Sequence, residues 1–441
     1  MSFKELIERA RKDKVAFLNL QFTDIMGSLK QVTAPVQSLA DILKYGAWFD
    51  GSSIEGFARI HESDLYLKPD PGTYALVPWL KSSPGNTARF VCDIYSPDGS
   101  PYKGDPRHIL RQMIKKANTL GYEYNIGPEL EFFLFRNDQS PLIPLDSGGY
   151  FDLATDEAHA IRSEITAALE LFGIDVEASH HEVAPGQHEI DFRYGEALTT
   201  ADRLLTLRVT VKAIAQRHGI RATFMPKPAM GMAGSGMHVH QSLFDRKTKK
   251  NVFYDPKDKY RLSKIAYHFI AGQIHHIKGM MPILCPTVNS YKRLVTGYEA
   301  PVYISWARIN RSALIRVPHW FDDRPNSARI ELRCPDPACN PYLAPAVMLA
   351  AGLDGIERKI PLPEAVEEDL YAFGEEKLSS RKIDTLPSSL YEAILDLKRN
   401  SLIQNVLGEH LSRRYIDIKT REWNTFKKQV TRWELDKYLD I

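Results

Sequence analysis

The chain has 441 residues, of which 44% are hydrophobic and 25% are charged. This composition is typical of a folded globular protein, and the length exceeds that of one ordinary domain. The 57 Lys and Arg residues nearly balance the 55 Asp and Glu residues, so the formal net charge is only +2. A protein that binds nucleic acid through its phosphates carries a basic excess or a basic stripe. The sequence has neither, which argues against nucleic acid as a partner.

The cysteines and the apolar segments bear on the cellular compartment. Cys92, Cys285, Cys334 and Cys339 show no CxxC spacing, which argues against a zinc ribbon, and so few thiols in a long chain favour a reducing compartment. The first residues, MSFKELIERARKDK, form a charged helical pattern unlike a signal peptide. No apolar run approaches the ~18 residues that span a bilayer. We therefore expect a cytoplasmic protein without membrane contact.

A turn-rich segment, Ser96–Gly104, divides the chain into two parts. The first part contains short strand-like runs at Val15–Phe22 and Ala88–Tyr95, and we expect residues 1–104 to form a small mixed domain. Residues 105–441 are expected to form a second, larger domain in which strands and helices are interspersed.

Helix signals are clearest at the start of the larger domain. Asp105 suits a cap, Pro106 suits the first helical position, and Gly121 suits the end of the helix. Further predicted strands are Tyr122–Arg136, His188–Tyr194, Met237–Phe244 and Ala328–Arg333. Further predicted helices are Ala201–His218, Ser263–Lys278 and Asn340–Lys359. The tail, Leu386–Ile441, is expected to be mostly helical and polar.

Two glutamates in the predicted strand Tyr122–Arg136 indicate a cation site. Glu129 and Glu131 are two residues apart, hence on one face of the strand, and their neighbours are Leu and Phe. Acidic pairs on a strand are usually a solvated face. An apolar setting argues against that reading, because buried carboxylates must be protonated, paired or bound to a metal.

A second pair follows in the segment HHEVAPGQHEIDF. If Pro185 and Gly186 closed a two-residue hairpin, Glu182 would face Glu189 directly. Like charges placed opposite each other on paired strands destabilise them, so this register would require a cation. Pro-Gly prefers a type II turn, which suits tight hairpins poorly, and a wider loop would shift the pairing.

Two later strands supply further ligand types. His238 and His240 share one face just after a glycine-rich loop, and Arg329, Glu331 and Arg333 share one face of their strand. The Arg-Glu-Arg face is equally compatible with a ladder of exposed salt bridges. A histidine together with several carboxylates favours Mg²⁺ or Mn²⁺ over structural zinc, and nearby arginines favour a phosphorylated or carboxylate substrate.

No standard nucleotide-binding fingerprint occurs in the sequence, because GxxxxGK[ST] is absent and the glycine loop does not fit GxGxxG. The residues alone therefore indicate a magnesium-dependent enzyme acting on an anionic, phosphorylated substrate.

Taken in order, several segments resemble the glutamine synthetase family of the bacterial and archaeal type (class I). The matching segments are FDGSSIEG (49–56), GPELEF (127–132), HEVAPGQHE (181–189), GSGMH (234–238), NSYKRLV (289–295), GYEAP (297–301), NRS (310–312) and RIELR (329–333). They extend over most of the chain. The resemblance implies an α+β fold, with a β-grasp N-terminal domain and a catalytic domain built on a curved antiparallel sheet and helices. It also implies a dodecamer of two stacked hexameric rings, with each active site between neighbouring subunits.

The resemblance further implies two divalent metal ions, Mg²⁺ or Mn²⁺, and ATP as co-substrate. One metal would be held by Glu131, Glu182 and Glu189, and the other by Glu129, His238 and Glu331. Glutamate would be bound by Gly234, Arg293, Arg311, Arg333 and Tyr150. The nucleotide would be bound by His240, Ser242, Arg316, Arg329 and Tyr194.

The implied reaction is the ligation of ammonia to glutamate through γ-glutamyl phosphate. Ammonium must lose a proton before it can attack, and Asp50 of a neighbouring subunit, with Ser53 nearby, is the implied acceptor. The acyl phosphate must be protected from water, and the segment Asn289–Pro301, carrying Glu299, resembles the lid that the family uses. Arg311 would stabilise the phosphorylated substrate.

Two positions depart from the family pattern. Ala233 replaces an asparagine beside the substrate amino acid, and Thr296 replaces a proline of the lid. Asp50 and Glu299 are present, which favours ammonia over the alkylamine or polyamine used by related ligases, and six intact metal ligands argue against an inactive relative.

Regulation is predicted only in outline. Tyr371 falls near the tyrosine that one subgroup adenylylates, but its surroundings differ, so we expect no adenylylation. Arg59 resembles the arginine of glutamine feedback inhibition in the other subgroup, and small regulatory proteins are possible partners.

Overall fold

The computed structural model of the chain describes residues 2–52, 54, 56, 64–82, 84–136, 142–152, 157–298, 300–321 and 323–441. Within these ranges the helices are α1 (Phe3–Lys12), α2 (Leu39–Tyr45), α3 (Pro106–Thr119), α4 (Glu157–Leu171), α5 (Ala197–Arg217), α6 (Lys264–Leu284), α7 (Ser290–Arg293), α8 (Leu343–Arg358), α9 (Glu375–Ser380), α10 (Leu390–Arg399), α11 (Ser401–Phe426) and α12 (Arg432–Tyr438). The strands are β1 (Val15–Thr23), β2 (Leu29–Pro35), β3 (Ala47–Asp50), β4 (Asp64–Pro69), β5 (Ala75–Ser82), β6 (Gly85–Tyr95), β7 (Tyr122–Arg136), β8 (Val176–His181), β9 (Gln187–Phe192), β10 (Gly195–Glu196), β11 (Ile220–Thr223), β12 (Met237–Asp245), β13 (Tyr303–Ala307), β14 (Ala313–Arg316) and β15 (Ile330–Leu332).

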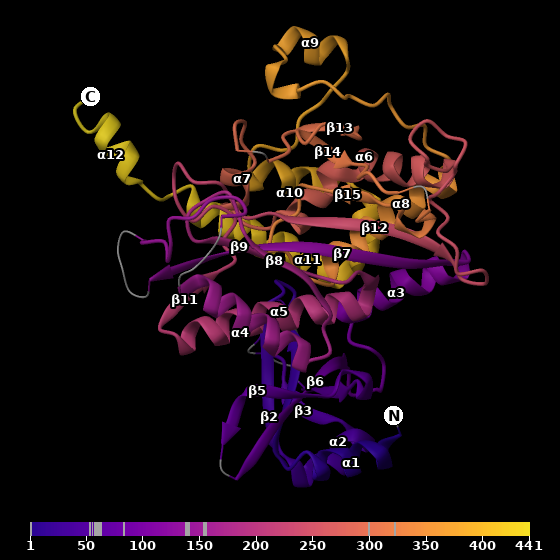
Figure 1. Cartoon of the computed structure of the whole chain (residues 1–441), viewed down its shortest axis with the longest axis vertical. Helices are drawn as coiled ribbons and strands as arrows, with labels where there is room; N and C mark the ends of the chain where they lie inside the picture. Colours follow the sequence, from indigo (N-terminus) through magenta and orange to yellow (C-terminus); the bar gives the residue numbers. More distant parts are fainter. Residues whose placement is uncertain are drawn as a thin grey trace.

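The strands of the described residues form two separate sheets. The N-terminal sheet has the order β2-β1-β6-β4-β3, with β5 also paired to β6, and β1 runs parallel to β6. The C-terminal sheet has the order β13-β14-β15-β12-β7-β9-β8, with β10 and β11 also paired to β7. Its pairs are antiparallel except for β13 and β14, which run parallel. Figure 1 shows the N-terminal sheet at one end of the molecule and the C-terminal sheet across its middle.

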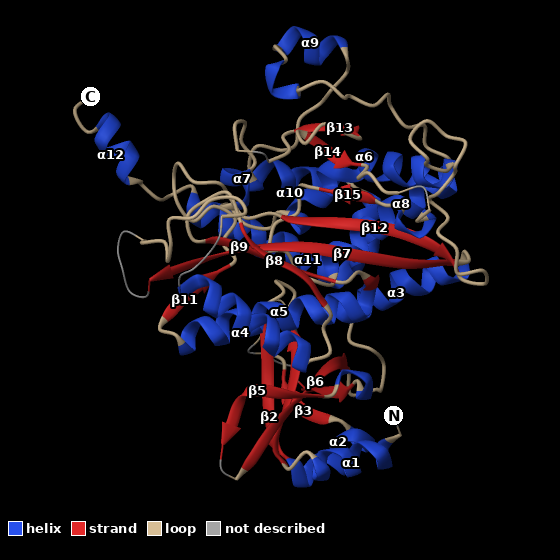
Figure 2. Ribbon diagram, viewed as in Figure 1, coloured by secondary structure: helices blue, strands red, loops and turns tan. Residues whose placement is uncertain are grey.

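Helices separate the two sheets and cover the rest of the larger part of the chain. Figure 2 shows α3, α4 and α5 between the N-terminal sheet and the C-terminal sheet. Helices α6, α8, α10 and α11 pack against one another. One apolar core continues through both parts, from Leu6 of α1 to Ile418 of α11. The short helix α12 extends away from the body at the C-terminus (Figure 1). Among the described residues, no helix combines the length and the apolar character needed to cross a membrane.

The local signals for α3 act as the sequence predicts. The Asp105 side chain accepts a hydrogen bond from the amide of Arg107, Pro106 occupies the first helical turn, and Gly121 follows with φ of +88°. Before α8, the Asn340 side chain accepts hydrogen bonds from the amides of Tyr342 and Leu343. The long tail is helical, as expected.

Several predicted boundaries were wrong, and tertiary contacts explain them. Helix α6 continues to Leu284, six residues beyond the predicted end at Lys278, and carries Pro282 inside it, because its last turns are completely buried. Helix α5 begins at Ala197, earlier than predicted, since the Glu196 side chain caps it. Strand β15 is shorter than predicted, because only residues 330–332 pair with β12.

A buried ion network joins the two parts of the chain. The guanidinium of Arg107 at the start of α3, of which 2% of the side chain is exposed, donates to Asp70 of the segment after β4, to Asp93 of β6 and to Asp202 of α5. Its shortest distance is 2.6 Å, to Asp93, and Asp202 also accepts the hydroxyl of Tyr342 at 2.8 Å. The network therefore fixes the N-terminal sheet against α3 and α5.

Candidate active site

Strand β7 is the centre of the candidate site, because both of its neighbours place polar residues opposite its glutamates. Glu129 pairs with His238 of β12 on one side and with Asp191 of β9 on the other, and Glu131 pairs with Glu189 of β9. The residues between the glutamates face the opposite way, as strand alternation requires. The predicted shared face of Glu129 and Glu131 is thus confirmed.

The first cluster consists of Glu129, His238 and Glu331, whose ligand atoms lie within 4.8 Å of one another. His238 Nδ1 lies 3.4 Å from a Glu129 oxygen and 3.6 Å from a Glu331 oxygen. Burial alone would raise the pKa of Glu129, but hydrogen bonds from His238 and His240 outweigh it and hold the pKa well below its usual value. These three residues are the set that the sequence assigned to one metal.

Two arginines surround the buried carboxylate of this cluster. Glu331 is completely buried and forms ion pairs with Arg316 and Arg333, the latter at 3.1 Å. Burial would raise the pKa of Glu331, but the charges of Arg333 and the nearby histidines hold it below its usual value. The Arg-Glu-Arg strand is therefore part of an interior site and not an exposed ladder of salt bridges.

The second cluster consists of His180, Glu182 and Glu189. His180 Nε2 lies 3.0 Å from Glu182 and 3.6 Å from Glu189. Burial, together with the charges of Asp191 and Glu131, raises the pKa of Glu189. Carboxylates crowded in this way are stable in ionised form only when a cation joins them.

The register of the hairpin that carries these residues differs from the two-residue prediction. Ala184 and Gln187 do close a tight turn, in which Gly186 has φ of +68°. Beyond that turn the pairing shifts, because the Glu182 amide bonds to the Gln187 carbonyl and His180 faces Glu189. The prediction that Glu182 faces Glu189 was wrong, and the wider loop is correct. The two carboxylates still meet at His180.

Glu131, assigned with Glu182 and Glu189, lies beside the second cluster. Its carboxylate accepts hydrogen bonds from the Gln187 side chain at 2.8 Å and from the Gly236 amide at 2.9 Å. Burial and the charge of Glu182 raise its pKa. His180, which the sequence analysis missed, takes the third place in the cluster. Its position two residues before Glu182 was the available signal, since alternate residues of a strand share a face.

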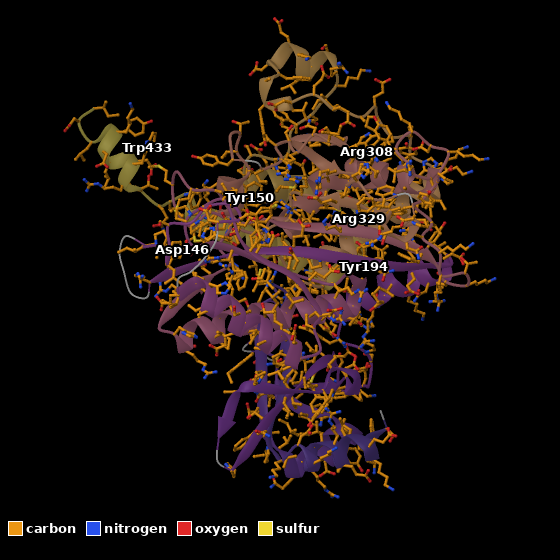
Figure 3. All side chains as sticks on the ribbon, viewed as in Figure 1. Asp146, Tyr150, Tyr194, Arg308, Arg329 and Trp433 are labelled. Atoms are coloured by element: carbon orange, nitrogen blue, oxygen red, sulfur yellow. The ribbon has the colours of Figure 1, made fainter. Side chains whose placement is uncertain are left out.

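A hollow of about 340 Å³ lies beside the first cluster. Four of the five residues assigned to the nucleotide line it: Tyr194, His240, Ser242 and Arg329. His240 bonds to Glu129 at 2.6 Å and faces the Arg329 guanidinium at 3.3 Å. Figure 3 labels Tyr194 and Arg329, which both line this hollow. The fifth residue, Arg316, lines the neighbouring hollow instead.

That second hollow, of about 440 Å³, contains residues of both clusters and the residues assigned to glutamate: Tyr150, Gly234, Arg293, Arg311 and Arg333. Ala233, which departs from the family pattern, also lines it. The Arg293 guanidinium is buried and donates to backbone carbonyls, including that of Cys334 at 2.8 Å. Burial, followed by the charge of Glu182, raises the pKa of Tyr150.

Asp191 was also missed by the sequence analysis. It lines both hollows together with Glu129, so the two hollows share a wall. One oxygen of Asp191 is buried without a hydrogen-bond partner in the described part of the chain. No motif of the sequence singled this residue out, because its position depends on the pairing of β9 with β7.

Asp50, assigned to ammonium, lines neither hollow of its own chain. Asp50 ends β3 in the N-terminal sheet (Figure 1), and hydrogen bonds from Ser52 hold its pKa below the usual value, so it is ionised at neutral pH. Ser53, Glu299 and Arg59 lie outside the described residues.

The donor set, the arginines and the paired hollows define a class of enzyme that uses a divalent metal and acts on anionic substrates. Comparison with known proteins narrows the class. Residues 14–97 match the family model for the glutamine synthetase β-grasp domain, and residues 103–438 match the model for the glutamine synthetase catalytic domain. The glutamine synthetase of Clostridium saccharobutylicum is 50% identical over 441 residues, covering 99% of this chain and 98% of the relative.

Solved structures agree with the sequence comparison. A complex of GmaS with ADP has a TM-score of 0.88 at 33% identity, covering 99% of both chains. The cryo-EM structure of Plasmodium falciparum glutamine synthetase has a TM-score of 0.89 at 28% identity, with the same coverage. The chain belongs to the glutamine synthetase family. Its activity is the ATP-dependent ligation of ammonia to glutamate, and the β-grasp and catalytic folds that the resemblance implied are confirmed.

Proposed function

We propose that the chain makes glutamine by converting the γ-carboxylate of glutamate to an acyl phosphate where the two hollows meet. One observation supports this proposal most directly. Glu129 and Asp191 line both hollows, so the hollow assigned to the nucleotide lies directly beside the hollow assigned to glutamate. A carboxylate is a poor electrophile, so its oxygen first attacks the γ-phosphorus of ATP and ADP leaves. Ammonia then attacks the acyl carbon, phosphate leaves with the C–O bond pair, and the surplus proton passes to a carboxylate.

The residues fit two divalent ions, Mg²⁺ or Mn²⁺. Glu129, His238 and Glu331 would hold one, and Glu182 and Glu189 would hold the other with Glu131 and His180 beside them. Oxygen-rich donor sets of this kind suit such ions, and the crowding of carboxylates at both clusters supports the assignment. When bound, the ions would neutralise charge on the phosphoryl group during its transfer.

The arginines and tyrosines of the hollows would orient the substrates. Arg293, Arg311 and Arg333 would bind glutamate and its phosphorylated form, with Gly234 and Tyr150 beside them. Arg316 and Arg329 would meet the phosphates of ATP, and His240, Ser242 and Tyr194 would line the nucleotide. The location of these residues supports the roles, since all of them except Arg316 lie in the corresponding hollow and Arg316 lies in the adjoining one. Arginine suits them because its planar fork pairs with two oxygens at once.

The ammonium site would be completed by a second copy of the chain. Asp50 is ionised and exposed at the end of an edge strand of the N-terminal sheet, and it lines neither hollow of its own chain. A neighbouring copy would present this residue, with Ser53, to the substrate hollow, and Glu299 of the lid would accept a proton. We propose a dodecamer of two hexameric rings as the assembly.

Four further assignments remain proposals. The chain would divide into domains at residues 1–104 and 105–441. It would act in the cytoplasm, it would be inhibited by glutamine through Arg59, and small regulatory proteins would tune it.

Glutamine formation from glutamate, ammonium and Mg-ATP tests the proposed chemistry. In Glu331→Gln, the rate should fall by more than the about 10- to 100-fold typical of an outer-shell partner, because Glu331 would be a direct ligand. Asp175→Asn is the matched control, since this carboxylate is 61% exposed beside β8 and outside both hollows. Full activity in Glu331→Gln would contradict the role of the first cluster. Turnover with methylamine but not ammonium would replace glutamine formation with an amine ligation.

A further inference from the structure

A third group of titratable side chains lies behind the second metal cluster, and the proposed reaction does not use it. The group consists of Asp146, His181 and His188, with Arg162 of α4 beside them, and is called the Asp146 cluster below. The side chains of Asp146, His181 and His188 are 4%, 2% and 0% exposed. They come from a loop, from the end of β8 and from the start of β9. Figure 3 labels Asp146 near Tyr150.

Asp146 connects the parts of the hairpin that carries Glu182. One of its oxygens accepts hydrogen bonds from His181 Nε2 at 2.7 Å and from the Gly186 amide at 2.8 Å. On its other side, His181 Nδ1 donates to the backbone carbonyl of Glu182 at 2.6 Å. The Asp146 carboxylate thereby holds two parts of the hairpin, the turn at Gly186 and His181 before it. The remaining oxygen lies 3.3 Å from His188 Nε2 on the opposite strand.

The hydrogen-bond pattern argues against a third metal ion in this cluster, although its ligand atoms lie within 4.8 Å of one another. The Arg162 guanidinium lies 2.7 Å from His188 Nδ1 and can only donate, so Nδ1 accepts and Nε2 keeps its hydrogen. Both ring nitrogens of His181 lie within hydrogen-bond distance of oxygen atoms, 2.6 Å from the Glu182 carbonyl and 2.7 Å from the Asp146 carboxylate. A metal ligand must offer a lone pair. Three of the four ring nitrogens already contact a protein group, and the fourth, His188 Nε2, carries the hydrogen of its ring, so none of the four is free for a metal ion.

The cluster is placed to control two metal ligands through the backbone. His181 directly precedes Glu182, and His188 directly precedes Glu189. The loop of Asp146 also continues to Tyr150 and is held to β8, because the Phe151 amide bonds to the His181 carbonyl at 3.1 Å. Movement of Asp146 would therefore displace both ligands and one wall of the substrate hollow.

We propose that Asp146 is a positioning residue for the metal ion of the second cluster, acting through His181 and His188 on the placement of Glu182 and Glu189. The inference rests on the proposed function in one respect, namely that these two glutamates bind metal. Outer-shell partners of metal ligands typically change metal affinity by about 10- to 100-fold when they are removed.

Binding of Mn²⁺ to the full-length assembled protein, followed by the electron paramagnetic resonance signal of free Mn²⁺, tests the proposal without turnover. In Asp146→Asn, we expect one class of Mn²⁺ site to weaken about 10- to 100-fold and the class assigned to Glu129, His238 and Glu331 to remain unchanged. Asp175→Asn should bind Mn²⁺ like the wild type. Asp146→Ala should weaken the same class at least as much.

His188→Gln separates positioning from direct metal binding. A glutamine can accept from Arg162 through its oxygen and place its nitrogen toward Asp146, where His188 Nε2 lies 3.3 Å from the carboxylate, so it keeps the polar arrangement of the histidine. We expect near wild-type Mn²⁺ affinity in this variant. This second variant also keeps the proposal testable if the Asp146 variants do not fold.

The outcomes of the titration are distinct. Wild-type protein that binds no Mn²⁺ would contradict the metal ligands of the proposed function. Wild-type protein with two classes of site that Asp146→Asn leaves unchanged would overturn the positioning role alone. Loss of one whole equivalent of Mn²⁺ in both Asp146→Asn and His188→Gln, with the other sites unaltered, would make the Asp146 cluster a metal site and also overturn the proposal.

Discussion

Substituting Arg107 by alanine would leave Asp70, Asp93 and Asp202 without the guanidinium that joins them. Only 2% of the Arg107 side chain and 10% of the Asp202 side chain are exposed, so water would not replace the lost partner. Removing one partner of a buried ion pair typically costs about 3–5 kcal/mol. We therefore expect the free energy of unfolding to fall by about that amount.

Urea unfolding at one fixed subunit concentration measures the effect, because assembly contributes to the apparent stability. Arg111→Ala is the matched control. Arg111 contacts the same two residues, Asp70 and Asp93, but its side chain is 38% exposed. Ion pairs at the surface contribute about 0–1 kcal/mol. Equal losses in the two variants would refute the reasoning, because burial would then not set the cost.

The pH dependence of the difference offers a second check. Burial would raise the pKa of Asp70, but the hydrogen bond and charge of Arg107 outweigh it and lower the pKa below its usual value. The unfolded chain then takes up a proton first as pH falls, so this stabilisation is complete above about pH 4 and is lost below it. The gap between the wild type and Arg107→Ala should narrow in acid.

Two further predictions concern the surroundings of the active site. Tyr371→Phe removes the hydroxyl that donates to the Ala300 carbonyl at 2.6 Å, at the end of the proposed lid. One hydrogen bond contributes about 0.5–1.5 kcal/mol, so kcat/KM for glutamine formation should fall about threefold to tenfold. Unchanged steady-state kinetics would show that this hydrogen bond does not hold the lid. In Gly186→Ala, the added Cβ would lie 2.7 Å from the Leu134 carbonyl, at a residue whose φ is +68°. The free energy of unfolding measured with urea should fall by about 1–2 kcal/mol. An increase in this free energy would mean that the turn adapts to alanine without strain.

Local chemistry accounts for what the sequence predicted well. Helix α3 has its capping side chain, its first-turn proline and its terminal glycine within a short stretch, so its limits follow from neighbours in the chain. Strand β7 was predicted at Tyr122–Arg136 and has those limits. Alternation along this strand also placed Glu129 and Glu131 on one face. Such features need no knowledge of the tertiary fold.

Features that depend on pairing between distant segments were predicted less well. Beyond the turn between Ala184 and Gln187 the pairing is displaced by two residues along β8, so that His180 and not Glu182 faces Glu189, and a turn does not by itself set the register beyond it. The position of Asp191 in the shared wall follows from the pairing of β9 with β7. Asp146 meets the two histidines across a loop that carries no periodic signal. The position of His180 could nevertheless have been predicted, because it lies two residues before Glu182 and alternate residues of a strand share a face.

The two glutamates on β7 affect the stability of the fold and the activity of the site in opposite ways. Leu130 and Phe132 are completely buried in the core of the molecule, and they alternate with the two carboxylates on the same strand. An amide at Glu131 would relieve repulsion in the ion-free protein and strengthen the fold, yet it would weaken a site that depends on negative charge. Selection for resistance to heat and selection for turnover therefore act in opposite directions on one strand, which limits how far either property can be improved there.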